Sequence, residues 1–215
     1  MSHAAKLGLL SGFVILAASL VAVRHLKEQP EMSGGRPNSA EPESSPSRAR
    51  AGERREPLVK PIATPKIVVH KAKRQLRLYS GDRALRTYPA GLGFQPVGDK
   101  QREGDGRTPE GTFYICNKNR DSKYYLSLGL SYPNTEDAAR GLREGLITQE
   151  QHDRILRAIE RREQPPWDTP LGGEIFIHGN GAKRDWTWGC VALEDEDIRE
   201  LFEAVPLGTP VVIHP

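Results

Sequence analysis

The chain of 215 residues is 37% hydrophobic and 27% charged, with a formal net charge of +3 at pH 7. This length suits one domain or two small ones, and its composition excludes a chain that is disordered throughout. Two cysteines exclude a disulfide-rich scaffold and a four-cysteine zinc or iron–sulfur site. The excess positive charge lies in residues 1–65, whereas residues 66–215 hold 22 basic and 22 acidic residues. This balance argues against binding to nucleic acid, which requires clustered basic side chains.

Residues 7–23 carry no charge and are flanked by Lys6 and Arg24. Such a stretch is long for the core of a signal peptide and slightly short for a bilayer span of about 20 residues. No clean A-x-A cleavage site is visible. We therefore expect residues 1–27 to anchor the chain in a membrane, with the rest on the extracytoplasmic, periplasmic side of the cell envelope. A cleaved signal peptide is the alternative.

Residues 28–65 are rich in Pro, Ser, Glu and Arg and contain few large apolar side chains. Such a stretch cannot bury enough surface to offset its chain entropy, so it is predicted to be a disordered linker. As a coil it would span roughly 30–40 Å. That reach suits a domain that works at a distance from its membrane anchor.

Short strands and three helices are predicted in residues 66–215. Alternating or continuous apolar runs predict strands at 67–70, 75–79, 84–89, 112–116, 174–178, 190–193 and 209–213. Asn134 or Thr135 is expected to cap a helix with Ala138, Leu142 and Leu146 on one stripe. A capping box of Thr148 and Gln151 predicts a second helix that ends near Arg162, and 195–204 fits a third. Residues 91–111 are rich in glycine and should form a long structured loop. The pattern indicates a single α+β domain, mainly β.

A histidine and a cysteine stand at the two ends of one glycine-containing loop. His178 ends a predicted strand, and Gly189 and Cys190 begin the next one. A free thiol with a pKa of about 8.5 is only a few per cent ionised at neutral pH, and a neighbouring imidazole can take its proton. We therefore expect Cys190 to be partly ionised near neutral pH. The adjacent amides of Gly189 and Cys190 would stabilise an oxyanion. Taken singly, each side chain also fits a structural role in the core.

Two stretches, GDKQREGDGRTPEGTFYI and IHGNGAKRDWTWGCVALEDEDIRELFEAVPLGTPVVI, resemble the L,D-transpeptidase catalytic domains of the YkuD type. The resemblance extends from Lys66 to His214, which is the whole predicted domain. It implies a YkuD-like β-sandwich with helical decorations, and an acyltransferase that needs neither cofactor nor metal. It also implies Cys190 as the nucleophile, His178 as the proton donor and acceptor, and peptidoglycan stem peptides as the substrate.

The sequence departs from the family pattern beside the nucleophile. Trp188 stands where a second histidine is usual, and Ala192 stands where an arginine commonly follows the cysteine. The carboxylate of a donor peptide would therefore lack its usual cationic partner. The candidates for substrate binding are the cations Arg107, Lys183 and Arg184 and the loop residues Trp186, Thr187 and Trp188.

These observations predict that Cys190 attacks an L,D peptide bond, forms a thioester and passes the acyl group to an acceptor amine. A hydrolase of the same fold, of the L,D-carboxypeptidase or amidase type, would use the same thiol and imidazole, so both remain open. A non-catalytic peptidoglycan-binding module is a third reading, against which the presence of both His178 and Cys190 counts. Cys116 lies in an apolar strand and is expected to be inert.

Overall fold

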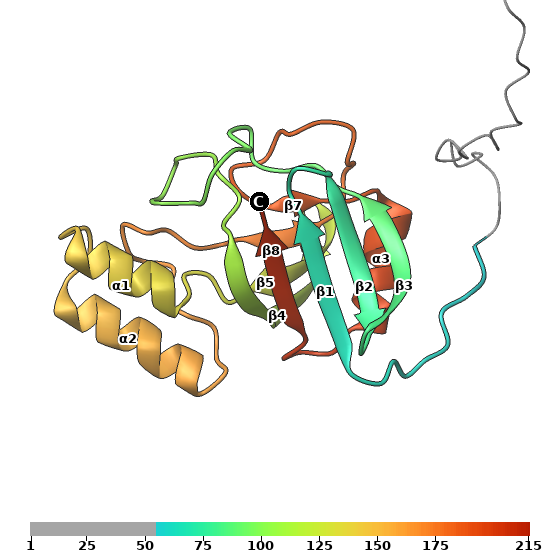
Figure 1. Cartoon of the computed structure of the whole chain (residues 1–215), viewed down its shortest axis with the longest axis horizontal. Coiled ribbons are helices and arrows are strands. Elements are labelled where there is room, and N and C mark those ends of the chain that lie inside the picture. The colour runs from blue at the N-terminus through green and yellow to red at the C-terminus, as the bar shows by residue number, and fades with distance from the viewer. Residues whose placement is uncertain (1–54) are drawn as a thin grey trace, which may run out of the picture. The chain divides into compact units, whose positions relative to one another are not determined.

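The computed structural model describes residues 55–215, so the expected anchor at 1–27 and the first part of the expected linker lie outside the described residues. Within 55–215, none of the helices has the length and apolar character needed to cross a bilayer. The elements, shown in Figure 1, are β1 Pro65–His70, β2 Gln75–Ser80, β3 Arg83–Pro89, β4 Gly111–Ser122, β5 Tyr125–Leu130, α1 Thr135–Arg143, α2 Gln149–Glu160, β6 Phe176–His178, β7 Val191–Ala192, α3 Asp195–Ala204 and β8 Pro210–His214.

The strands form one sheet in the order β3-β2-β1-β8-β4-β5-β6-β7. Strand β4 joins its two halves, because Gly111 to Tyr114 pair with β8 and the residues from Ile115 onward pair with β5. The register shifts between Ile115 and Asn117, and such a bulge increases the local twist of a sheet. The sheet therefore curls over itself (Figure 1). The expected sandwich is made by one curled sheet rather than by two separate ones.

The curled sheet encloses one hydrophobic core. Alternation along β2 places Leu76 and Leu78 inside, as the sequence pattern predicts, and α3 adds Ile198, Leu201 and Phe202. Beyond β3, the backbone of Gly91 exchanges hydrogen bonds of 2.9 and 2.8 Å with Ala192 of β7. The segment that follows one edge of the sheet thus reaches the strand at the other edge. This closure brings the glycine-rich loop next to the loop that precedes β7.

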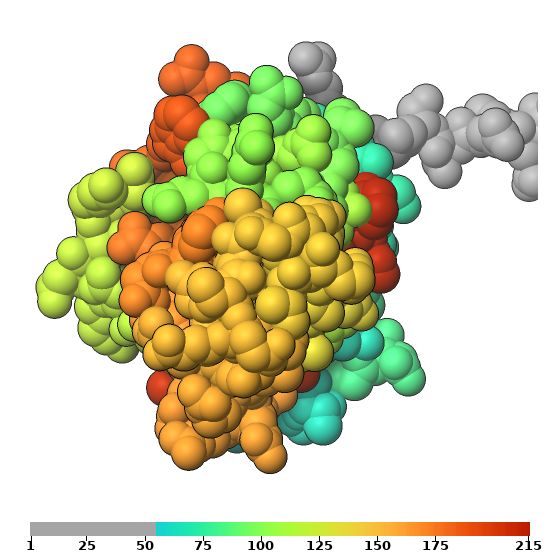
Figure 2. Space-filling view, turned by 90° about the vertical axis from the view of Figure 1, so that its left-hand side faces the viewer, coloured from blue at the N-terminus to red at the C-terminus, as the bar shows by residue number. Residues whose placement is uncertain are grey.

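Helices α1 and α2 form a hairpin between β5 and β6. The capping boxes at their N-termini, Asn134 with Asp137 and Thr148 with Gln151, confirm both predicted helix starts. Helix α1 ends at Arg143, so Leu146 of the expected stripe lies in the following turn, where it packs on the small core of the hairpin. Figure 2 shows the hairpin (yellow to light orange) at the centre of one face, with the glycine-rich loop (green) beside it.

The structure differs from the predicted strands at β5, β6 and β7. Strand β5 was not predicted, because Ser127 to Leu130 are buried on both faces and show no alternation. Strand β6 begins at Phe176 rather than at Glu174, since Glu174 adopts a φ of 54°, which breaks the extended backbone. Strand β7 is limited to Val191 and Ala192. The nucleophile therefore lies in the turn before the strand.

Residues 55–64, the end of the expected linker, lie against the domain. Leu58 and Ile62 pack on the core. Arg55 pairs with Asp197 of α3, and the Lys60 Nζ is 2.9 Å from a Glu203 carboxylate oxygen on the same helix. The two apolar side chains account for the contact, because burial of such groups is the main favourable term in packing. The packed part of the chain thus begins about ten residues before the predicted boundary.

Candidate active site

Cys190 faces the backbone that leads into β6. Its Sγ lies 3.5 Å from the Glu174 carbonyl oxygen, to which the thiol donates, and 3.4 Å from the Phe176 amide nitrogen, which donates to it. Burial raises the pKa of Cys190 to about 11. The thiol is therefore protonated at neutral pH. The expectation of a partly ionised Cys190 is wrong for the resting site, because loss of water disfavours the thiolate.

His178, the last residue of β6, is buried and held by a local hydrogen bond. Its Nδ1 lies 2.8 Å from the Gly179 carbonyl oxygen, so Nδ1 carries the proton and Nε2 is the nitrogen able to accept one. Burial lowers the pKa of His178 from its usual value of 6.5. The imidazole is therefore neutral at pH 7, like the thiol.

Pairing of β6 with β7 places the histidine and the cysteine in neighbouring segments. The two strands run parallel, with Ile177 opposite Val191 and His178 opposite Ala192. Continuing this register places Cys190 beside Phe176, which agrees with the contact of its Sγ to that residue. Cys190 therefore lies against the backbone of β6, two residues along that strand from His178. Within residues 55–215, no hydrogen bond joins the two side chains in this resting arrangement.

Two aromatic side chains enclose the imidazole of His178. Tyr124, in the turn between β4 and β5, stacks on it with ring centroids 4.5 Å apart and planes at 23°. Trp186 meets it at 5.6 Å and 71°, and its indole N–H donates to the Gly181 carbonyl oxygen over 3.1 Å. Trp186, which was predicted to bind substrate, thus also packs against the His178 imidazole. Tyr124 was missed, because the stretch around it contains no motif and reaches the site only through the pairing of β5 with β6.

Thr187 and Gly189 shape the turn before the nucleophile. The buried Thr187 hydroxyl donates to the Cys190 carbonyl oxygen over 2.7 Å and accepts from the Gly189 amide over 3.2 Å. Gly189 has a φ of +129°, and a Cβ built on it would lie 2.7 Å from the Arg107 carbonyl oxygen. Glycine is required here for both reasons. The motif glycine thus lets the glycine-rich loop approach the nucleophile.

The other predicted substrate-binding residues are less closely gathered. Arg107 meets the site through its backbone carbonyl, and its Nη1 lies 3.4 Å from the Asp99 carbonyl oxygen. Trp188 is 67% exposed and packs edge-to-face on Phe94, with centroids 4.7 Å apart. Lys183 and Arg184 are exposed. Thr187 is therefore a structural support of the turn, whereas the side chains of Trp188, Lys183 and Arg184 are exposed.

Two further lysines act on the thiol. The strongest influence on the pKa of Cys190 is burial, which raises it. The hydrogen bond from the Phe176 amide opposes this rise most, followed by the charges of Lys100 and Lys123, while the charge of Glu174 adds to it. Lys100 is itself buried, and its Nζ donates to Asp105 Oδ1 and to the Arg102 carbonyl oxygen, both over 2.9 Å. Lys100 was not predicted as a site residue, because a lysine in a polar loop is usually exposed. Among the described residues, no cluster of three or more His, Cys, Asp or Glu could hold a metal ion.

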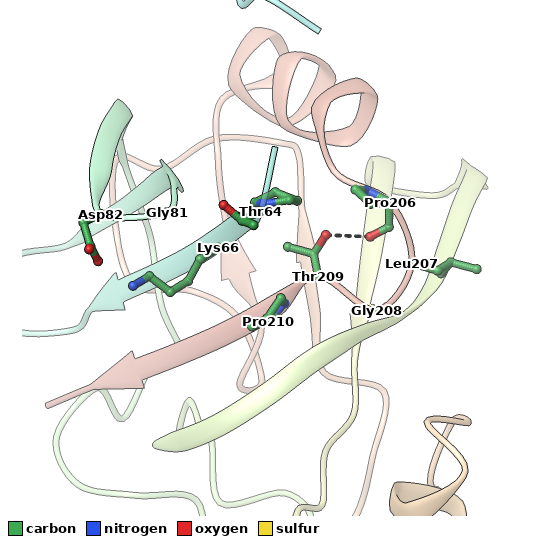
Figure 3. Close-up of a pocket in the computed structure, with 10 residues that line it drawn as sticks. Thr64, Lys66, Gly81, Asp82, Pro206, Leu207, Gly208, Thr209 and Pro210 are labelled. Carbon is green, nitrogen blue, oxygen red and sulfur yellow. Dashed lines mark hydrogen bonds between the residues drawn. The ribbon is translucent and has the colours of Figure 1, made fainter. Parts of the chain in front are cut away.

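A pocket of about 530 Å³ lies elsewhere on the domain, where β1 and β8 begin (Figure 3). Lys66 and Asp82 line it, together with the turn from Pro206 to Pro210. Neither His178 nor Cys190 is among the lining residues. This pocket is therefore not part of the candidate active site.

The ionisation of Cys190 can be read from its alkylation. Only the thiolate reacts with iodoacetamide, so with a pKa near 11 the rate should be low at pH 7 and rise about tenfold per pH unit to about pH 10. The measurement is the mass of the peptide that contains Cys190, sampled over time at each pH. The urea-unfolded chain is the control and should react faster at pH 8. A rate that levels off below pH 8 would show an ionised resting thiol instead.

The chain is similar to known proteins over its folded part. Residues 64–213 match the model of the YkuD family, the L,D-transpeptidase catalytic domain. Over 123 residues the chain is 28% identical to "Putative L,D-transpeptidase YafK" of Escherichia coli strain K12, which covers 54% of this chain and 37% of that protein. The chain thus spans under two fifths of the length of this curated relative.

Solved structures are also similar to this chain. A mutant of the helical cell shape determining protein Pgp2 from Campylobacter jejuni is 23% identical, with a TM-score of 0.51, over 72% of this chain and 50% of that one. Bd1075 from Bdellovibrio bacteriovorus is 22% identical, with a TM-score of 0.46, over 73% and 49% of the two chains. Since the family model covers most of the folded residues, the chain belongs to the YkuD family of L,D-transpeptidase catalytic domains.

Proposed function

We propose that this protein is a cysteine-dependent L,D-transpeptidase that acts on peptidoglycan stem peptides through a thioester. The observation that carries the proposal is the pairing of β6, which ends at His178, with β7, which directly follows Cys190, while the Gly179 carbonyl oxygen engages Nδ1 of the histidine. This leaves Nε2 to exchange protons with the thiol. Such a nucleophile and base, with the base oriented by a third group, is the arrangement that covalent acyl transfer requires.

The proton moves during the attack rather than before it, because thiol and imidazole are both neutral at rest. The Cys190 Sγ bonds to the carbonyl carbon of the L,D peptide bond while its proton passes to His178 Nε2. The peptide C–N bond then breaks, and the imidazolium returns the proton to the departing amine of the D-amino acid. An acceptor amine attacks the thioester and gives up its own proton to His178, which returns it to the thiolate.

The developing oxyanion is assigned to the backbone amide of Cys190. The neighbouring Gly189 amide already donates to the Thr187 hydroxyl over 3.2 Å, so it contributes less to such a site than the sequence predicts. A preorganised amide donor is typically worth a factor of about 100 or more in rate. The substrate lies outside the cytoplasmic membrane, so the proposal includes an extracytoplasmic catalytic domain.

The test is incubation of the full chain with disaccharide-tetrapeptide, followed by mass spectrometry. Cross-linked dimers that have lost one terminal D-amino acid support transfer to an amine. Shortened monomers without dimers support hydrolysis, in which water replaces the acceptor. No change in the peptide would contradict both and favour a binding module. The Cys190→Ala protein is the control for background hydrolysis.

A further inference from the structure

The turn between β4 and β5 reaches the catalytic base and is tied to it by the backbone. The Tyr124 carbonyl oxygen accepts hydrogen bonds from the Gly179 amide over 3.0 Å and from the Leu126 amide over 3.1 Å. The Tyr124 amide donates to the Ser122 hydroxyl over 3.1 Å. Both polar groups of the Tyr124 backbone are therefore occupied. Tyr124 is therefore held next to His178 by a backbone hydrogen bond to Gly179 as well as by the contact between the two rings.

The close approach of this turn depends on two unusual backbone positions. Tyr125 adopts a φ of 74°, a left-handed conformation that costs free energy in a bulky residue and that tends to occur at functional sites. A Cβ built on Gly179 would lie 2.8 Å from the Tyr124 carbonyl oxygen and 2.5 Å from Asp195 Oδ1. The glycine after the histidine therefore allows the turn to close on the base.

The hydrogen bond from Nδ1 to the Gly179 carbonyl fixes only one atom of the imidazole. The ring could still pivot about that contact and turn Nε2 away from the thiol. Tyr124 covers the face of the ring at 4.5 Å, and Trp186 meets it at an inclination of 71°. Together these contacts oppose a pivot. Trp186 and Tyr124 also touch each other, with centroids 5.8 Å apart.

We propose that Tyr124 is a positioning residue for the general base: its ring holds the His178 imidazole with Nε2 available to take the Cys190 proton. This inference rests on the proposed function. The tyrosine ring also favours the charged form of the base, because the face of an aromatic ring attracts a cation. The imidazolium must form in a buried place, where water cannot stabilise it. Two charged groups flank the pair: Lys123, whose Nζ is 5.1 Å from the Tyr124 ring centroid, and Asp195, which accepts a hydrogen bond from the Asn180 amide.

The first test compares Tyr124→Leu, Tyr124→Met and Tyr124→Phe in the full chain. We expect the Leu and Met variants to lose about tenfold in kcat with little change in KM, because a flexible side chain offers neither a flat face nor a π-system. The Phe variant should keep kcat within about twofold. Tyr79→Leu is the matched control, since Tyr79 lies on β2 and contacts Lys66. Thermal unfolding of each variant verifies that it folds.

The second test does not depend on turnover. In the histidine-labelled full chain, nitrogen NMR should show His178 as a single tautomer with the proton on Nδ1, assigned by its loss in His178→Ala. Tyr124→Leu and Tyr124→Met should show averaged shifts of the two ring nitrogens, whereas Tyr124→Phe should match the wild type. A single tautomer and wild-type kcat in a folded Leu or Met variant would overturn the inference. If the wild type turns over no stem peptide, the proposed function fails, and the NMR result still decides the positioning role.

Discussion

Replacing Cys190 by alanine should abolish turnover of stem peptides and leave the domain folded. The sulfur supplies the atom that forms the thioester, and removal of a catalytic nucleophile lowers kcat by a factor on the order of 10⁶. The side chain is half-buried, and its two contacts to Glu174 and Phe176 are long, so the free energy of unfolding should change by no more than about 1 kcal/mol. Product formation is measured by mass spectrometry, and stability by urea unfolding.

Cys116→Ala is the matched control. Cys116 is also half-buried, its thiol donates to the Gly129 carbonyl oxygen over 3.5 Å, and burial raises its pKa to about 11. The two thiols therefore have similar acidity and differ mainly in position, since Cys190 directly precedes the strand that pairs with the His178 strand, whereas Cys116 lies in β4. Cys116→Ala should keep full turnover and lose about 1 kcal/mol of stability to a small cavity. Turnover by Cys190→Ala, or its loss in Cys116→Ala, would contradict the assignment of the nucleophile.

Gly189→Ala should inactivate the protein by displacing the nucleophile. The new Cβ would lie 2.7 Å from the Arg107 carbonyl oxygen and 3.0 Å from Ile175 Cδ1, and the φ of +129° is unfavourable for alanine. Backbone oxygen cannot move aside without a shift of the glycine-rich loop or of the Cys190 turn. A misplacement of about 1 Å at a reacting centre costs roughly 100-fold in rate. We expect at least that loss in kcat, with a decrease of about 2–4 kcal/mol in the free energy of unfolding.

Gly104→Ala separates backbone strain from steric contact. Gly104 also has a positive φ, of +74°, but no atom lies within 4 Å of the Cβ that alanine would add. This variant should lose about 1 kcal/mol of stability through its backbone conformation and retain turnover. If Gly189→Ala behaves like Gly104→Ala, the contact with Arg107 does not set the position of the nucleophile.

The sequence determined the features that depend on neighbours along the chain. Helices α1 and α2 begin at their capping boxes because an N-cap side chain and the third helical residue satisfy each other's backbone groups within one turn. The pairing of β6, which ends at His178, with β7, which follows Cys190, was also predictable, since one short loop joins the two strands. Family membership followed from the same stretch, together with the glycine-rich loop.

The tertiary structure decided the features that depend on distant segments. Tyr124 reaches His178 only because β5, a strand without alternation, pairs with β6. The curl of the sheet depends on the bulge in β4, which the sequence does not mark. The protonation of Cys190 was predicted wrongly, because a neighbouring imidazole favours the thiolate whereas burial, which depends on the packing of the whole domain, favours the thiol more strongly. Spacing along the chain specifies which groups can meet, but solvent exclusion around them is a property of the packed fold.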